Sequence, residues 1–478
     1  MTLATRTPTA PQAPAPYEPG AYYDEALRPD GRPRPVYERL LGELAELDLG
    51  ALTEKIARDA RMQHVTFGGG SDAQGFHVDP VPRLFERAEW NRLRDGLRQR
   101  ARALGEFLAD VYGERRIVAA GVVPARVVDS AEHFEPWMLG VESPGGRAPV
   151  VGFDVVRGAD GKLRVLEDNL RTPSGFTYAL AARRLVDAHR PRTALLPRAA
   201  IEGCFDQLGE ALRAAAPDGH GDPSVVLLSD GPENSAWYEH VTIARRLAIP
   251  IVGARDLRPR DGRLYVVLPS GRLREVQVVY RRTDEDRLSD ERGRPTWIAD
   301  ALLEPVRHGT LAVVNGLGNG VADDKLVHAY VEDMVRFYLG EEPLVESVRT
   351  YDLGRPEYRT RALGRLGALV VKPRGGYGGH GVVICSHCSR AERDVAAASI
   401  RDAPDRFVAQ ETIALSRHPT VIDGRLEPRH VDLRAFAIGT GPDITVVPGG
   451  LTRVALDRGS LLVNTSQNGG GKDTWVVG

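Results

Sequence analysis

Hydrophobic residues recur at helical spacing in several stretches of the chain. Residues 35–61 and 88–112 place apolar side chains three or four positions apart, which predicts two long amphipathic helical regions. A further helical stretch is expected to end near residue 215. The segment 68–83, between the first two regions, is rich in glycine and proline, so we expect turns there.

The spacing changes near Pro149, where short runs of branched apolar residues begin. Residues 148–157 and 163–170 flank the turn GADGK and predict a β-hairpin. Residues 223–257 follow the order strand, loop, helix, strand, which predicts a βαβ unit with parallel strands. Strands and one helix alternate in the last section: strands at 366–373, 382–386, 405–413, 430–439 and 445–456, and a helix at 390–403. The patterns indicate an α/β (mixed α+β) protein.

Composition narrows the class of protein further. A length of 478 residues allows about two to four domains. The net charge of −2 gives no strong field toward nucleic acid or an acidic membrane, so we expect neither as a partner. No run of apolar residues is long enough for a membrane span, and residues 1–20 read as a disordered Pro/Ala-rich tail without a signal peptide. Three cysteines fit a reducing compartment, and we expect a cytoplasmic protein.

Glycines cluster between two predicted strands. Residues 376–381 (GYGGHG) match the dinucleotide fingerprint G-x-G-x-x-G, but a strand pattern follows them where that fingerprint requires a helix. The dinucleotide interpretation therefore fails on context. A glycine-rich loop between strands can instead fold its backbone N–H groups over phosphate oxygens as a lid, and Lys372 at the end of the entering strand is placed to reach the same phosphates. The alternative is a flexible hairpin loop that binds nothing.

A polar set of residues lies on the predicted hairpin. Glu167 and Asn169 are two positions apart, so their side chains share one face of the sheet, and Asp154 can join them from the other strand. Two carboxylates and an amide oxygen suit Mg²⁺, which prefers hard oxygen ligands. Spacing alone favours the alternative, an exposed polar face of the hairpin.

Three weaker signals remain. Asp323 is a plausible N-cap for the helix that follows it, and Lys325 near that helix start suggests an anion contact or an ordinary surface position. The strand end from Gln410 to Ile413 offers a hinge for an adenine ring. Cys385 and Cys388 have the C-x-x-C spacing but no second ligand pair for zinc, so we expect ordinary thiols.

Taken in order, these pieces resemble the circularly permuted ATP-grasp family related to the glutathionylspermidine synthetases. The similarity rests on motifs such as VLEDNLRTPSG, GVADDKLVHAYV, LVVKPRGGYGGHGV and HVDLRAF, and it extends from about Tyr22 to the C-terminus. In an unpermuted ATP-grasp enzyme the metal-ligand strands come after the glycine lid, whereas here they precede it. The resemblance implies a permuted ATP-grasp fold with a Rossmann-like pre-ATP domain and a glycine-lid subdomain.

The resemblance also implies roles for individual residues. Two arginines would act on the reacting groups: Arg434 would face the phosphates or the acyl group, and Arg171 would steady the transferred phosphoryl group. Glutathionylspermidine synthetases carry an arginine two residues before the first metal-binding aspartate, where this chain has Gly152, so that role is either moved to Arg171 or lost. The ATP-binding set would be Lys325, Lys372, Gly375, Gly376, Tyr377, Gly378, Gly379, Gly381, Gln410, Glu411, Thr412 and Ile413, and the Mg²⁺ ligands would be Asp154, Glu167 and Asn169.

We therefore expect an ATP- and Mg²⁺-dependent carboxylate–amine ligase that works through an acyl phosphate, with small-molecule or peptide substrates. The alternatives are an ATP-dependent kinase or phosphotransferase on the same fold, and a non-catalytic nucleotide-binding protein. The expected divisions are the tail 1–20, a helical region with the metal hairpin at 21–220, a Rossmann-like domain at 221–345, and the lid subdomain with closing strands at 346–478. The segment SQNGGGKDTW (466–475) is a second glycine cluster, for which a mobile loop near the active site is one hypothesis.

Overall fold

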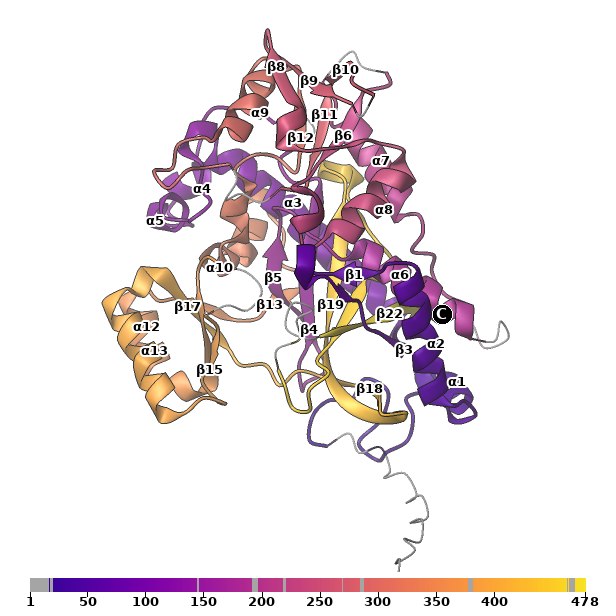
Figure 1. The fold of residues 1–478 in the computed structure, drawn as a ribbon. Helices are drawn as coiled ribbons and strands as arrows, with labels where there is room; N and C mark the ends of the chain where they lie inside the picture. The colour runs from indigo at the N-terminus through magenta and orange to yellow at the C-terminus, as the bar shows by residue number, and fades with distance from the viewer. Residues whose placement is uncertain are drawn as a thin grey trace, which may run out of the picture.

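The computed structural model describes residue 17 and residues 20–143, 146–190, 197–217, 221–268, 270–283, 288–376, 381–461, 463 and 469–478. Three bodies of structure are visible in Figure 1: a large central sheet with helices, a smaller α/β unit above it, and a second small unit to one side. Short elements beside these bodies are β1 (Thr66–Phe67), β2 (Gln74–Gly75), α4 (Arg116–Ala119), α5 (Ala125–Asp129), α10 (Lys325–His328) and α11 (Val331–Met334).

The large sheet takes strands from both halves of the chain. Its order is β13-β5-β4-β19-β21-β22-β3, with β18 and β20 paired to β19. Most neighbours are antiparallel, but β22 runs parallel to β3 and β13 parallel to β5. The bounds are β3 (Val78–Glu86), β4 (Val150–Arg157), β5 (Leu163–Asn169), β13 (Glu346–Ser347), β18 (Arg417–Ile422), β19 (Arg425–Ile438), β20 (Thr445–Val446), β21 (Leu451–Val454) and β22 (Gly470–Val477).

Helices cover both faces of this sheet, because its central strands are apolar on both sides. Phe153 and Leu433 belong to the core cluster that contains the apolar stripe of α3 (Arg87–Val111). On the other face, Phe436 packs edge-on against Phe176, which begins α6. The helices on that second face are α1 (Pro35–Ala45), α2 (Leu49–Met62) and α6 (Phe176–His189). The sheet is therefore the buried middle layer of the molecule.

The upper unit in Figure 1 is built on a parallel sheet of order β12-β11-β6-β7. The predicted βαβ unit is confirmed, since β6 and β7 pair in parallel and α8 connects them. An antiparallel sheet of order β10-β9-β8 extends from it. Its elements are α7 (Cys204–Ala214), β6 (Val225–Leu228), α8 (Trp237–Leu247), β7 (Ile251–Val252), β8 (Leu257–Arg260), β9 (Arg263–Val267), β10 (Leu273–Val276), β11 (Val278–Arg281), α9 (Trp297–Arg307) and β12 (Ala312–Val314).

The side unit consists of a four-stranded sheet of order β14-β17-β15-β16 backed by two helices (Figure 1). Leu369 and Val371 point from β15 into a core shared with these helices. Because side chains alternate along a strand, Lys372 points to the opposite face of the same strand. The elements are β14 (Thr350–Asp352), α12 (Pro356–Gly364), β15 (Leu369–Pro373), β16 (Val383–Ile384), α13 (Arg390–Asp402) and β17 (Phe407–Glu411).

The turn prediction for residues 68–83 is wrong in its second half. From Val78 onward the chain is β3, an almost wholly buried strand. Pro80 and Pro82 suggested a turn because proline lacks an N–H donor, yet β3 ends the strand order of the sheet and needs a hydrogen-bonded partner on one side only. The register also shifts between Lys472 and Thr474, opposite these prolines. An edge strand with an irregular register accommodates both prolines.

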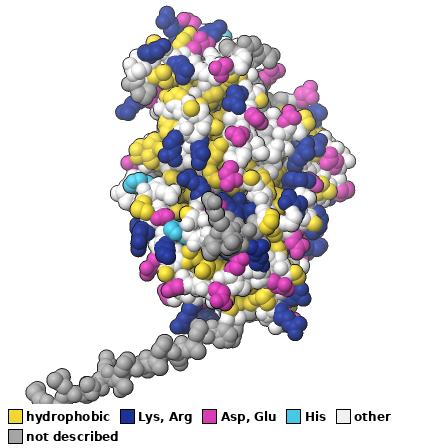
Figure 2. Space-filling view, turned by 90° about the vertical axis from the view of Figure 1, so that its right-hand side faces the viewer, with side chains coloured by type: hydrophobic (Ala, Val, Ile, Leu, Met, Phe, Trp, Pro, Cys, Tyr) yellow, Lys and Arg dark blue, Asp and Glu magenta, His cyan; other side chains and the backbone are white. Residues whose placement is uncertain are grey.

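The helices and the molecular surface show two further properties. Among the helices of the described residues, none is sufficiently long and apolar to cross a bilayer. On the face shown in Figure 2, basic and acidic side chains are interspersed rather than gathered by sign. This distribution matches the small net charge of −2.

Candidate active site

The predicted hairpin is present as β4 and β5, and it brings the three polar residues together. Asp154 pairs directly opposite Glu167, and Gly152 opposite Asn169. Glu167 and Asn169 share one face, while Asp168 between them points to the other side. The sequence prediction of a common face for Asp154, Glu167 and Asn169 therefore agrees with the register of the strands.

Asp154 is held by two arginines from neighbouring strands. Arg434 of β19 stands opposite it and donates from Nε to Oδ1 and from Nη2 to Oδ2, the latter at 3.0 Å. Arg453 of β21 lies 2.9 Å from Oδ2 and also pairs with Asp432. Burial by itself raises the pKa of Asp154, but the two guanidinium groups outweigh it and hold the pKa at about 2. The carboxyl group is thus an anion.

Lys372 connects the side unit to the hairpin. Its Nζ lies 3.7 Å from Oε1 of Glu167, whose side chain keeps 33% of its surface exposed. Burial raises the pKa of Glu167, yet Lys372 and then Lys325 outweigh it and the pKa is lowered. The pKa of Lys372 is also lowered, chiefly by burial and further by Lys325, despite the attraction of Glu167. Two cations and a carboxylate therefore meet at the junction of two sheets.

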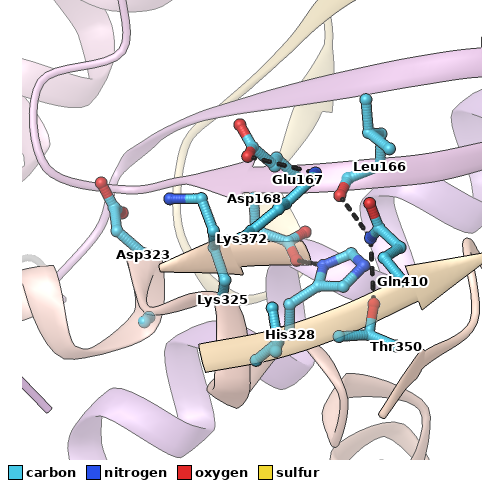
Figure 3. Close-up of a pocket in the computed structure, with 11 residues that line it drawn as sticks. Leu166, Glu167, Asp168, Asp323, Lys325, His328, Thr350, Lys372 and Gln410 are labelled. Carbon is cyan, nitrogen blue, oxygen red and sulfur yellow. Dashed lines mark hydrogen bonds and ion pairs between the residues drawn. The ribbon is translucent and has the colours of Figure 1, made fainter. Parts of the chain in front are cut away.

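These groups line one cavity, shown in Figure 3. Counted together with the solvent at its mouth, the space between these groups is about 260 Å³. Lysine nitrogens lie at one end beside Glu167, and Gln410 and Thr350 lie at the other (Figure 3). The lining residues are Leu166, Glu167, Asp168, Ala322, Asp323, Lys325, His328, Thr350, Lys372, Val408 and Gln410. A cavity that is cationic at one end and partly apolar at the other suits a molecule with an anionic tail and a ring.

Lys325 begins α10 and reaches toward the glycine loop, where its Nζ donates to the carbonyl oxygen of Gly376 at 2.8 Å. The expectation that Asp323 caps this helix is wrong. Asp324 is the N-cap and accepts from the N–H of Leu326 at 2.8 Å. Asp323 is used elsewhere, because its carboxylate accepts from the backbone and side chain of Arg171.

Arg171 lies on the loop after β5, beside the helix that carries Lys325. Its Nε donates to Asp323 Oδ2 at 2.9 Å, and Nη1 lies 3.0 Å from Nε2 of His133. Burial, with the charges of Arg171, Arg281 and Lys325, lowers the pKa of His133 to about 3. His133 is therefore neutral and accepts a hydrogen bond from Arg171.

The glycine loop joins two antiparallel neighbours, β15 and β16, so a strand follows it and not a helix. Arg374 fixes its start by donating to Asp324 at 3.0 Å and to Ser130 Oγ at 2.7 Å. Gly376 and Gly381 have φ values of +89° and +71°, which favour glycine. A Cβ at Gly375 would lie 1.6 Å from a carboxylate oxygen of Glu132. Tyr377, Gly378 and Gly379 lie outside the described residues.

The predicted adenine hinge divides into residues with different surroundings. Gln410 lines the cavity, and its Nε2 donates to Thr350 Oγ1 at 2.9 Å. The carboxylate of Glu411 is bound by Arg365 at 2.8 and 3.0 Å. Thr412 donates its N–H to Ala368, and Ile413, like Leu166, packs against a small apolar cluster that includes Val348 and Leu415. Gln410 is the member of this set that lines the cavity.

The C-terminal glycine cluster continues into β22, the strand next to the edge strand β3. Lys472 of β22 is fully buried and ion-paired with Asp79 of β3. Asp79 also accepts from the N–H groups of Val81 and Val421. The hypothesis of a mobile active-site loop is therefore wrong for residues 470–477, which are a buried strand; residues 464–468 lie outside the described residues.

The sequence analysis did not identify three groups near the cavity. They are Arg453, which forms an ion pair with Asp154, the side chain of His133, and the hydrogen-bonded pair of Asp168 and His328. His328 carried a usable signal, since it follows Lys325 by three positions and such residues share a helix face. Arg453 and His133 gave none, because each reaches the site only through the pairing of strands and loops far apart in the sequence.

Comparison with known proteins agrees with the fold. Residues 82–455 match the family model described as circularly permuted ATP-grasp type 2. A glutathione synthetase-like effector, GSS30 from Globodera pallida, superposes with a TM-score of 0.56 at 13% identity over 90% of this chain and 98% of its own.

Relatives of known sequence cover nearly the whole chain. A Synechocystis protein described as uncharacterized is 42% identical over 96% of this chain and 98% of its own length. A Frankia alni protein, provisionally named glutamate–cysteine ligase 2-3, is 43% identical over 96% of this chain, which spans 54% of that longer protein. The predicted mixed α/β fold and its family are confirmed: the chain belongs to the circularly permuted ATP-grasp family, type 2.

Proposed function

We propose that the protein is an ATP- and Mg²⁺-dependent ligase that joins a carboxylate to an amine through an acyl phosphate. The observation that carries this proposal is the cavity at the junction of two sheets, where Lys325 and Lys372 face Glu167. Phosphoryl transfer needs positioned charge rather than a protein nucleophile. The family relationship supports ATP as the phosphoryl donor.

The residues of the hairpin fit Mg²⁺ to different degrees. Glu167 offers a partly exposed carboxylate. Asn169 beside it would use its amide oxygen, since its amide nitrogen, which has no partner among the described residues, is a donor and cannot bind a cation. Asp154 fits only if it shares its oxygens with Arg434 and Arg453, which a carboxylate with about four lone-pair sites permits. Among the described residues no three His, Cys, Asp or Glu side chains form a metal cluster, so the amide and the phosphates would complete the ligand set. Bound there, Mg²⁺ would neutralise phosphate charge.

The reaction then needs two displacements. A carboxylate oxygen of the first substrate attacks the γ-phosphorus, the bond from that phosphorus to the bridging oxygen breaks, and ADP leaves. The amine of the second substrate attacks the acyl carbon, inorganic phosphate leaves, and the amine loses a proton to give the amide. In this proposal Lys325 and Lys372 hold the phosphates, and Arg171 and Arg434, which pair with Asp323 and Asp154, stabilise the charge that develops.

The substrates are proposed only as a class. The name of the Frankia relative combines a glutamate and a cysteine, a carboxylate and an amine, but this chain spans about half of that protein. The lysines and arginines of the site suit an acidic first substrate. A molecule with at least one carboxylate beyond the one that reacts is therefore the natural choice for a first screen.

The acyl phosphate provides the test. The protein is incubated with MgATP, a panel of carboxylates and hydroxylamine, because hydroxylamine traps an acyl phosphate as a hydroxamate. We expect ADP release and hydroxamate with the same carboxylate. ADP release with a phosphorylated alcohol and no hydroxamate would identify a kinase instead.

A matched pair of variants shows whether the activity belongs to this protein or to a contaminating enzyme. Lys372→Met should abolish both products, while Lys55→Ala, at an exposed position on α2, should retain them. Equal activity in the two variants, or no binding of MgATP by the wild-type protein, overturns the proposal.

A further inference from the structure

His328 lies deep in the nucleotide cavity and is only 5% exposed. It is the last residue of α10, three positions after Lys325. Its Nδ1 lies 2.7 Å from Oδ2 of Asp168. Asp168 is in turn gripped by Arg100, whose Nε and Nη2 donate to the two carboxylate oxygens at 2.6 and 2.7 Å. The imidazole is thus held in one orientation by two buried residues.

These contacts fix which ring nitrogen carries the proton. Arg100 donates to both oxygens of Asp168, which is the bidentate contact typical of an ionised carboxylate. The carboxylate is then an acceptor only, so Nδ1 must donate to it. Arg100 Nη2 lies 3.1 Å from Nδ1 because both nitrogens donate to the same oxygen. In its neutral form the ring therefore offers Nε2 as an acceptor.

Nε2 is buried and has no hydrogen-bond partner within the described residues. Buried polar atoms without partners are rare in folded proteins, and a ligand is one cause of such a vacancy. In Figure 3 the ring stands between the lysines and Gln410, with one nitrogen joined to Asp168 and the other turned toward the Gln410 and Thr350 side. The free acceptor therefore faces the interior of the site, away from the lysines.

We propose that Nε2 of His328 accepts a hydrogen bond from the nucleoside part of ATP and so selects the nucleotide. This inference rests on the proposed function. In the neutral ring Nε2 is an acceptor, so it pairs with a donor such as the adenine amino group or a ribose hydroxyl rather than with a phosphate oxygen. Asp168 and Arg100 then serve as positioning residues, since they set the tautomer and the orientation of the ring.

The surrounding surfaces support a nucleoside at this position. Leu166 and Val408 are apolar members of the cavity lining that also contains His328, and Gln410 donates a hydrogen bond to Thr350. The phosphates belong with Lys325 and Lys372 at the other end of the cavity. A nucleotide laid along this axis presents its sugar and base to the histidine.

The experiment measures equilibrium binding of three Mg²⁺-nucleotides by calorimetry: ATP, purine riboside triphosphate, which lacks the amino group, and 2′,3′-dideoxyATP, which lacks both ribose hydroxyls. We expect one analogue to bind the wild-type protein about 3- to 10-fold more weakly than ATP, the effect of one uncharged hydrogen bond. Which analogue binds more weakly shows whether His328 accepts its hydrogen bond from the amino group or from a ribose hydroxyl.

Two variants separate the contact from the fold. His328→Asn places an amide near Asp168 but removes the acceptor at the Nε2 position. Its affinity for ATP should therefore fall to its affinity for the sensitive analogue, so that the two nucleotides bind equally. His328→Gln puts an amide oxygen near the Nε2 position and should retain part of the difference. Thermal unfolding of the free variants checks that both are folded.

The outcomes are distinguishable. If the wild-type protein binds ATP but all three nucleotides bind equally, or if His328→Asn weakens ATP while the analogue difference persists, the role of His328 is overturned and the proposed function stands. If the wild-type protein binds no nucleotide, the proposed function fails and this inference fails with it.

Discussion

Lys372 and Glu167 meet at 3.7 Å, and this contact joins the lid-bearing sheet to the sheet that carries the hairpin. Each residue comes from a different unit, β15 and β5. Because 3.7 Å is longer than a hydrogen bond, we expect an incoming phosphate and metal ion to separate the two groups. It therefore marks the place where the two units and the proposed nucleotide come together.

Removing the charge of Lys372 should impair nucleotide binding without harming the fold. We expect Lys372→Met to weaken MgATP binding by about 10- to 100-fold, the size of a lost charge-assisted hydrogen bond. Stability should be unchanged or slightly higher, because a buried ammonium group is removed while Glu167 remains partly solvated. Calorimetry and thermal unfolding measure the two effects. Strong destabilisation would show that Lys372 is chiefly structural.

Glu167 should govern the metal dependence of ATP binding. Glu167→Gln removes the charge but keeps the shape, so we expect the Mg²⁺ concentration for half-maximal stabilisation by ATP to rise at least several-fold. Glu346→Gln is the matched control, since Glu346 lies on the neighbouring strand β13 and is exposed. The thermal unfolding midpoint, followed during a Mg²⁺ titration with and without ATP, reports the difference. Identical titrations for the two variants would remove Glu167 from the metal site.

His133 should contribute to the pH dependence of stability. Its pKa is about 3 in the folded protein, below the ordinary value of 6.5. Between these values the unfolded chain binds a proton that folded His133 does not, so stability falls as pH decreases from about 7 toward 4. His133→Gln keeps an acceptor for Arg171 and cannot titrate, so its urea midpoint should fall less over this range. Parallel pH curves for both proteins would contradict the assignment.

Lys472 should matter for stability alone. Lys472→Met leaves Asp79 buried without its counter-charge, and we expect a loss of about 3–5 kcal/mol in the free energy of unfolding. Combining it with Asp79→Asn should recover part of that loss. The folded fraction of the Lys472→Met variant should bind ATP with the same affinity as the wild-type protein. An altered affinity in the folded single variant would revive a role for the C-terminal segment at the active site.

The sequence predicted those parts of the site that depend on local geometry. The shared face of Glu167 and Asn169 follows from the alternation of side chains along a strand. The position of Lys372 on the entering strand and the glycine loop between two strands follow from the strand patterns on either side of the loop. The helices on both sides of the sheet were also predictable from their periodicity. Neither inference required knowledge of how distant segments pair.

The parts of the site that the sequence did not predict depend on the register between strands that are far apart in the chain. Arg453 reaches Asp154 only because β21 lies next to β19 in one register, and no spacing in the sequence encodes that alignment. Likewise, the glycines around Lys472 predict a loop, and the pairing of β22 with β3 is what makes this residue part of a strand. Asp324 replaced Asp323 as the helix cap because Asp323 is bound to Arg171, 152 residues away. Single-residue assignments of this kind need the tertiary structure.

The pairing of β3 with β22 has a consequence for biosynthesis. Lys472 and Asp79 are 393 positions apart, and Arg434 follows Asp154 by 280. On the ribosome, the hairpin that bears the carboxylates is made long before the arginines that neutralise them. Because long-range pairings form late, and β4 is buried along its whole length in the folded protein, the nascent chain carries an uncovered apolar strand for most of its synthesis. Until β19 is made, this strand is a site at which nascent chains can associate wrongly.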